Sequence, residues 1–289
     1  MLDINRVLFP TDGSACAENA WSYAAYIADQ FDAQLHIIRV DERTPEWEDV
    51  IEVKEADLLE ELHAPIETDR VPPPQRQEHA VVHSDAAHGI VAYVTEHDMD
   101  LVVLGTHGRR GVRRAMLGSV AEDVVRHAPC PVLTVGRGPQ MEPERAFDRA
   151  LVPVDFSDHQ EQLLDTVRDW ALLFGTEVSL LHVVQLESLP AEYGIEIGHS
   201  DPQEVIQRVQ SALETDAAEL HEAGVSADVE VRNGFPVDEI LEAVESREAG
   251  FLAIATHGRT GLQRMMMGSV AEKVIRRASC PVLTVKSFG

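Results

Sequence analysis

Apolar positions along the chain fall into short continuous runs and longer stretches in which they recur every three or four residues. The runs Leu101–Leu104 and Phe251–Ile254 are continuously apolar, which is typical of strands buried on both faces of a parallel sheet. The stretches Ala20–Phe31 and Leu163–Phe174 have one apolar face at helical spacing. Strands alternating with helices of this length predict a doubly wound α/β sheet.

The same pattern places the individual elements of each half. After an opening strand and helix, each half continues with a strand, at Gln34–Val40 and at Glu177–Val184. In the first half we then expect helices near Trp47–Leu62, near Ala86–His97 and from Ser119, and strands near Ala80–His83, at Leu101–Gly105 and at Val132–Val135. Each half is thus predicted to be a five-stranded parallel sheet flanked by helices, with Pro72–Pro74 a break inside the first one.

A long internal repeat supports this division. Thr106–Val135 and Thr256–Val285 are identical at 21 of 30 aligned positions, where unrelated segments of average composition share about two. Upstream, Val7–Ser14 matches Ala150–Ser157 more weakly. A repeat on this scale predicts two copies of one domain in tandem.

The segment between the copies, Gly136–Phe147, is rich in Gly and Pro and lacks apolar periodicity, so we interpret it as the linker. The predicted domains are residues 1–138 and residues 147–289.

The formal net charge of −26 narrows the classes of partner. Such a charge repels nucleic acid phosphates and anionic membranes, so neither is expected as a partner. Only Lys54, Lys273 and Lys286 are lysines, and an acidic, lysine-poor surface suits a high-salt cytoplasm, which is a hypothesis about habitat alone. Without an apolar run of about 18 residues or a secretion signal, a cytoplasmic location is expected.

A glycine-rich loop follows the strand that ends at Gly105. Gly108 and Gly111 come next, and Gly118-Ser119 opens a helix. Glycines let a ligand approach the backbone, and the amides at a helix N-terminus favour phosphate. An alternative is purely structural, because Ser119–Glu122 also has the spacing of a capping box, repeated at Ser269–Glu272.

The complete spacing is more specific than either feature alone. The pattern Gly105-x₂-Gly108-x₉-Gly118-Ser119, with the opening Pro10–Ser14 and the closing Pro131–Val135, resembles the ATP-binding signature of the universal stress protein family. The resemblance extends over nearly all of both halves. It implies two tandem Rossmann-like domains of the adenine nucleotide alpha hydrolase-like type.

The resemblance also implies a nucleotide site in the first half. It would place adenine and ribose at the end of the first strand and phosphates over the glycine loop, using Pro10, Thr11, Asp12, Val40, Gly105, Gly108, Arg109, Gly118, Ser119 and Val120. Asp12 would bond the ribose or help to hold Mg²⁺ on the phosphates; its structural alternative is to stabilise a turn. Arg109 and Arg114, repeated as Arg259 and Arg264, are candidates to neutralise phosphate, or are solvated loop charges.

The second half departs from this pattern, which puts its site in doubt. Ala255 replaces the first glycine, Val154 replaces Thr11 and Phe156 replaces Gly13. An added methyl beside the phosphates predicts weaker binding. The corresponding candidates are Pro153, Val154, Asp155, Val183, Gly258, Arg259, Gly268, Ser269 and Val270.

Other chemistry has little support in the sequence. The chain has no Walker A loop, no H-E-x-x-H and no C-x-x-C, and His79, His83 and His88 fit no standard zinc spacing, so no metal ligands are assigned. Cys130 and Cys280 occupy equivalent positions, which favours small buried residues, with a redox role as the alternative. His107 and His257 are interpreted as structural loop residues.

The leading hypothesis is an ATP-binding regulator of the stress response with little or no turnover, because no group beside the loop is evident to activate water. A slow ATPase and a nucleotide-free scaffold are the alternatives. The resemblance further implies that the halves pair through Pro131–Val135 and Pro281–Val285 as a pseudo-dimer within the chain. A homodimer of whole chains stays open.

Overall fold

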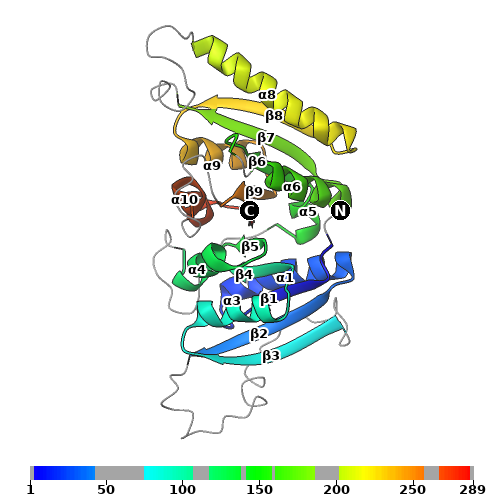
Figure 1. The fold of residues 1–289 in the computed structure, drawn as a ribbon, viewed down its shortest axis with the longest axis vertical. Coiled ribbons are helices and arrows are strands. Elements are labelled where there is room, and N and C mark those ends of the chain that lie inside the picture. Colours follow the sequence, from blue (N-terminus) through cyan, green and yellow to red (C-terminus); the bar gives the residue numbers. More distant parts are fainter. Residues whose placement is uncertain are drawn as a thin grey trace, which may run out of the picture.

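The ten strands described in the computed structural model form one continuous sheet in the order β3-β2-β1-β4-β5-β10-β9-β6-β7-β8 (Figure 1). The structure describes residues 3–42, 75–106, 117–137, 141–157, 160–185, 202–256 and 267–286. The helix expected near Trp47–Leu62 and the break at Pro72–Pro74 lie outside these residues.

The first half follows the predicted alternation in its described residues. Its strands and helices are β1 (Arg6–Pro10), α1 (Ala15–Phe31), β2 (Gln34–Glu42), β3 (Arg76–His83), α3 (Ala86–Glu96), β4 (Leu101–Gly105), α4 (Ser119–His127) and β5 (Val132–Val135). Strand β3 begins earlier than the Ala80 expected from the apolar pattern, because its first residues, Arg76–His79, are polar and only half-buried.

The second half has the full β-α-β-α-β-α-β-α-β order. After the short helix α5 (Pro143–Ala146) come β6 (Arg149–Pro153), α6 (Gln160–Phe174), β7 (Glu177–Val184), α8 (Pro202–Glu222), β8 (Ala227–Asn233), α9 (Pro236–Ser246), β9 (Phe251–Ala255), α10 (Ser269–Arg277) and β10 (Val282–Val285). Within each half all neighbouring strands are parallel, as the sequence predicts.

The halves meet where β5 and β10 pair antiparallel. Leu133 lies opposite Leu283, flanked by the pairs Val132↔Thr284 and Thr134↔Val282. The apolar closing strands thereby cover each other's edge, as the family resemblance implies for Pro131–Val135 and Pro281–Val285. The result is a pseudo-two-fold arrangement of two similar sheets inside one chain (Figure 1).

Each face of the sheet carries a core that runs through both halves. Helices α1, α5, α6 and α8 cover one face, and α3, α4, α9 and α10 cover the other. Each of these two clusters combines buried residues from the first and the second half. The two repeats therefore share their hydrophobic cores and do not merely touch.

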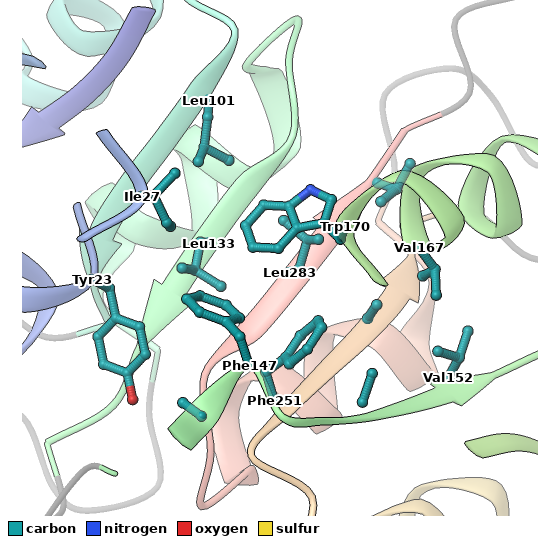
Figure 2. Packing of buried hydrophobic residues seen from close by; sticks show 14 of the residues in the cluster. Tyr23, Ile27, Leu101, Leu133, Phe147, Val152, Val167, Trp170, Phe251 and Leu283 are labelled. Atoms are coloured by element: carbon teal, nitrogen blue, oxygen red, sulfur yellow. The ribbon is translucent and has the colours of Figure 1, made fainter. Parts of the chain in front are cut away.

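The linker is more structured than its composition predicts. It contains α5, and Phe147 directly after that helix is 1% exposed. The Phe147 ring packs at centroid distances of 5.2 Å from Trp170 and 5.3 Å from Phe251 (Figure 2). Its centroid also lies 4.7 Å from that of Phe174. Periodicity could not reveal this anchor, because a single aromatic ring has no period.

No helix in the described part of the chain is both long and apolar enough to cross a bilayer.

Candidate functional site

The strand order reverses between β1 and β4, which lie side by side with Val7 opposite Leu101. In open α/β sheets a ligand binds at such a reversal, beyond the carboxyl ends of the strands. Here that edge carries Pro10 at the end of β1 and Gly105 at the end of β4. The predicted site residues from separate segments thus meet at one edge.

A tight turn connects β1 to α1 at this edge. Thr11 N donates to Ile38 O of β2 at 2.9 Å, which fixes the turn beside the strand that carries Val40. Gly13 has a φ of 70°, and Asp12 Oδ1 accepts a hydrogen bond from Ser14 N at 3.0 Å. The structural role considered for Asp12, stabilising a turn, is therefore present in the molecule.

Gly105 has a packing role that the sequence did not reveal. A β-carbon at this position would lie 2.8 Å from both the carbonyl carbon and the carbonyl oxygen of Cys16 in α1. The buried Cys16 thiol in turn donates to Val135 O at 3.3 Å. Glycine at the end of β4 therefore allows α1 to lie directly on the sheet, whatever it also contributes to a ligand.

The start of α4 corrects the capping-box alternative. Gly118 is the N-cap residue, with φ −62° and ψ 143°, and no side chain caps this end of the helix. Ser119 is already inside the first turn, and Glu122 forms an ion pair with Arg126 at 2.8 Å and does not reach back to the helix start. Gly118 N donates to Thr106 O at 2.7 Å, which ties the helix start to the end of β4.

This arrangement leaves the helix start suited to an anion. The first amides of an α-helix have no acceptor within the helix, and the helix dipole adds to their attraction for negative charge. At α4 these are the amides of Ser119 and Val120; Ser119 is exposed, and Gly118 and Val120 are half-buried. The N-terminus of α4 can therefore hold a phosphate group.

Some predicted site residues cannot be placed. Gly108, Arg109, Arg114 and His107, with their counterparts Gly258, Arg259, Arg264 and His257, lie outside the described residues.

The second half repeats the geometry of this helix start. Gly268 is the N-cap of α10, with φ −60° and ψ 141°, and Gly268 N donates to Thr256 O at 2.7 Å. Ser269 and Val270 open the helix as Ser119 and Val120 do. Pro153 and Val183 occupy the same strand ends as Pro10 and Val40.

The turn after β6 differs from the turn after β1. Phe156 has a φ of 55° at the position of Gly13, and its ring lies 4.8 Å from the ring of His182. His182 Nδ1 donates to the carbonyl of the buried Val154 at 2.7 Å, and Asp155 Oδ1 accepts from Ser157 N at 3.1 Å. The turn after β6 thus carries an aromatic side chain, packed on His182, at the position where the first half has a glycine.

Polar contacts join the two halves along α4 and α10. Glu122 Oε2 on α4 lies 3.3 Å from Arg276 on α10, and Arg276 also pairs with Glu272 at 2.7 Å. Lys286, 8% exposed, donates from Nζ to the carbonyls of Arg126 at 2.7 Å and Ala128 at 2.8 Å. Lys286 is one of only three lysines in the sequence, and no pattern along the chain indicates that it joins the two halves.

The histidines and cysteines fall into separate environments. His79 lies near His36 and His97, whereas His83 and His88 lie on the side of His127. In the described part of the chain, no group of three or more His, Cys, Asp or Glu residues has the geometry to hold a metal ion. Burial raises the pKa of the Cys130 and Cys280 thiols to about 12, which disfavours the reactive thiolate.

Comparison with known proteins gives a consistent result. The model of the universal stress protein family matches residues 3–136 and 146–286. A universal stress protein of Methanocaldococcus jannaschii is 34% identical over 150 residues, covering 50% of this chain and 84% of the relative. The universal stress protein YxiE of Bacillus subtilis is 32% identical over 151 residues, covering 48% of this chain and 99% of the relative.

A solved universal stress protein structure from Archaeoglobus fulgidus has the same fold over its whole length. It superposes with a TM-score of 0.67 over 98% of both chains, at 20% sequence identity.

Proposed function

The chain belongs to the universal stress protein family, and from this premise we propose that its first half binds ATP, which regulates the protein in a stress response with little or no turnover. The units of this proposal are the tandem domains 1–138 and 147–289.

The start of helix α4 carries the proposal. Gly118 caps the helix without a side chain, so the amides of Ser119 and Val120 remain available to phosphate oxygens. The turn at Thr11 and Asp12 lies at the end of β1, which neighbours both β2 with Val40 and β4. We propose that phosphates bind at α4 and that adenine and ribose bind near Thr11 and Val40, with Gly108 and Arg109 completing the site.

Mg²⁺ is proposed as the companion of ATP. A carboxylate oxygen of Asp12 and the phosphates are the kind of hard ligands that this ion prefers. Turnover would further need a group that activates a water molecule, and the sequence supplies no evident one beside the glycine loop. We therefore propose nucleotide as a ligand that favours one state of the protein over another.

The second half is proposed to bind nucleotide more weakly. Its helix start at Gly268 matches the first half, but the turn after β6 carries Phe156, packed on His182, where the turn after β1 has Gly13. Because phosphate contacts alone give little selectivity for a nucleoside, the two halves are expected to differ in affinity.

Titration calorimetry with MgATP tests the proposal on two matched variants. Gly118→Asp keeps a good helix cap but places a carboxylate where phosphate would bind, so the dissociation constant should rise at least about tenfold, corresponding to about 1.4 kcal/mol. Gly268→Asp makes the same change in the second half and should leave the stronger site unchanged. The opposite ranking would contradict the assignment.

Two further measurements separate the alternatives. Mass spectrometry of ligand released from the purified protein should give an adenine nucleotide at a defined ratio to the chain. Steady ADP release with ATP in excess over the protein would instead support a slow ATPase. The absence of both bound and titratable nucleotide would support a scaffold.

A further inference from the structure

Helix α9 of the second half is held by ion pairs, and the equivalent contacts of α3 in the first half are made by histidines. At one end of α9, Arg247 Nε lies 2.8 Å from Glu230 Oε2, and Arg247 Nη1 donates to Ser179 Oγ at 3.2 Å. At the other end, Asp238 pairs with Arg277 of α10 at 3.0 Å.

Strand register establishes which positions correspond. Pro10 lies opposite Ile38 in the first half, as Pro153 lies opposite Leu181 in the second. On the next strand Ile38 faces His79, and Leu181 faces Glu230, so His79 occupies the position of Glu230. By the same register His36 corresponds to Ser179, and His97 ends α3 as Arg247 ends α9.

The first set of histidines, His36, His79 and His97, forms a triangle under the C-terminal end of α3. Their ring centroids are separated by 5.8 Å (His36–His79), 6.1 Å (His36–His97) and 6.3 Å (His79–His97). Tyr93 of α3 joins the set through its hydroxyl, 2.8 Å from His36 Nδ1. Three imidazoles thus replace an arginine, a glutamate and a serine.

The second set lies near the N-terminal end of α3. His88 and His127 occupy the positions of Asp238 and Arg277, and their rings lie 6.5 Å apart. His83 at the end of β3 lies 6.3 Å from His88. At both ends of the helix, the ion pairs of the second half are therefore replaced in the first half by imidazoles, whose charge depends on pH.

Charges around the first set resist the addition of protons. Burial, together with the nearby His79, His97 and Arg6, lowers the pKa of His36 to about 4. Its Nε2 is buried without a partner. Arg6 also donates to His97 O at 2.9 Å and lies 4.0 Å from the exposed carboxylate of Asp98.

The other polar groups facing this set do little to offset these charges. Gln77 Oε1 lies 3.3 Å from His79 Nε2, but this side chain is uncharged. Burial and the nearby Glu96 carboxylate raise the pKa of Tyr93 to about 12. Asp100 accepts from the amides of Asn5 and Arg6. Protons on His79 and His97 therefore place two cations side by side next to Arg6.

Each histidine of the second set has a polar partner at its Nδ1. Asp85 Oδ1 lies 2.9 Å from His88 Nδ1 at this exposed end. His83 Nδ1 instead accepts from Asp85 N at 3.1 Å, which requires the neutral ring. His127 Nδ1 donates to Asp123 O at 2.8 Å.

The remaining carboxylates around the second set are already engaged. Asp123 Oδ1 lies 3.8 Å from Arg126, and Glu42 Oε1 accepts from Ala86 N at 3.3 Å. Protonation of His83 and His127 thus adds like charge beside a charged His88 and removes one hydrogen bond to the loop before α3.

We propose that α3 is an acid-sensitive element: protons taken up by the two histidine sets loosen it from the first half, while α9 stays in place. Histidine is the side chain whose charge changes between about pH 5 and 8, whereas the ion pairs of α9 persist through that range. The net charge of −26 favours proton uptake by both halves. Comparing α3 with α9 therefore separates the effect of the histidines from the effect of the overall charge.

Loosening of α3 would also reach the nucleotide site, a step that rests on the proposed function. A β-carbon on Gly89 in the first turn of α3 would lie 3.0 Å from both His83 Cβ and Val40 Cγ1. Val40 is a proposed adenosine contact, and its side chain packs against this first turn of α3. Acid is therefore expected to weaken nucleotide binding in the first half.

Hydrogen exchange read by mass spectrometry tests the proposal on the full-length protein without nucleotide. Peptides covering α3 and α9 are compared at about pH 7.5 and about pH 5.5, after correction for the intrinsic exchange rate. One extra proton bound by the open state per pH unit changes the opening equilibrium about tenfold. We expect protection of α3 to fall at least tenfold more than protection of α9; equal changes would overturn the proposal.

Reciprocal variants test its cause. His88→Asp with His127→Arg installs the second-half ion pair and should reduce the acid response of α3, while Asp238→His with Arg277→His should give α9 an acid response. If either double variant fails to fold, His79→Glu with His97→Arg tests the other set. Unchanged acid responses in the folded variants would overturn the assignment to these histidines.

Calorimetry then addresses the nucleotide step. The loss of ATP affinity on acidification should be smaller in His88→Asp/His127→Arg than in the native chain. Protonation of ATP itself affects both proteins equally, so it does not contribute to this difference. An equal loss would overturn the link between α3 and the site. Absence of binding at both pH values would refute the proposed function and leave the exchange result standing.

Discussion

The backbone of Cys16 lies so close to Gly105 that a β-carbon on Gly105 would come within 2.8 Å of the Cys16 carbonyl carbon and oxygen. Gly105→Ala should therefore push α1 away from the sheet and lower the free energy of unfolding by about 1–3 kcal/mol, the usual effect of overpacking. Urea denaturation followed by circular dichroism measures this. If the urea midpoint and the slope of the transition are both unchanged, α1 moves without lowering the free energy of unfolding.

The ring of Phe147 is packed against aromatic side chains of the second half and, at 5.9 Å, against Tyr23 of the first. Phe147→Ala should lower the free energy of unfolding by about 3–5 kcal/mol, because it leaves a cavity in a core that both halves share. Leu172→Ala, at a site 50% exposed, is the matched control and should change it by less than about 1 kcal/mol. Calorimetry that shows similar losses for both variants would contradict this role.

Lys286 should give the stability a distinctive pH dependence. Burial lowers the pKa of Lys286 to about 8 from an ordinary value of 10.5, so between these values the unfolded chain binds the proton that the folded chain has lost. The free energy of unfolding of the native chain, relative to Lys286→Met, should therefore rise with pH in this window, by up to about 1.4 kcal/mol per unit. Denaturation of both proteins at several pH values measures the difference, and a flat or falling difference would refute the shift.

The thiols of Cys130 and Cys280 should resist alkylation in the folded protein. Burial raises their pKa to about 12, so near pH 8 almost none of either thiol is the reactive thiolate. Peptide mapping after iodoacetamide treatment should find both positions labelled only in denaturant. Rapid labelling of native Cys280 would favour the redox alternative.

The second nucleotide site should be recoverable. Phe156→Gly with Val154→Thr restores the first-half residues at the turn after β6 and relieves a non-glycine φ of 55°. Because the helix start at Gly268 already matches Gly118, the dissociation constant of the weaker site should fall toward that of the stronger site in calorimetry. Two sites of equal affinity in the native chain would show that Phe156 does not obstruct the second site.

Most of the fold can be predicted from the sequence, because the same pattern of strands and helices occurs in both copies of the repeat. Apolar runs at Leu101–Leu104 and Phe251–Ile254 locate central strands, and the pairing of the closing strands that the family resemblance implies is confirmed at the β5–β10 junction. Phe147 and Gly105 escaped prediction because their roles depend on contacts with distant segments, which local periodicity does not encode.

The candidate site is only partly accessible from sequence for the same reason. The spacing of Gly118 and Ser119 correctly marks a helix start, but the Ser119–Glu122 capping box is wrong, because Glu122 instead pairs with Arg126 and Arg276. His79 and His88 were noticed along the chain, whereas their neighbours His36 and His127 come from other elements and became visible only in the fold.

Joining the two copies by α5 and Phe147 has a consequence for how they can diverge. In an assembly of two identical subunits, every substitution appears on both sides of the junction, so Phe156 in place of glycine would alter both sites at once. A single gene encoding both copies lifts that restriction. One copy can keep a binding site while the other acquires Phe156, Lys286 and fixed ion pairs, with the shared β5–β10 junction still intact.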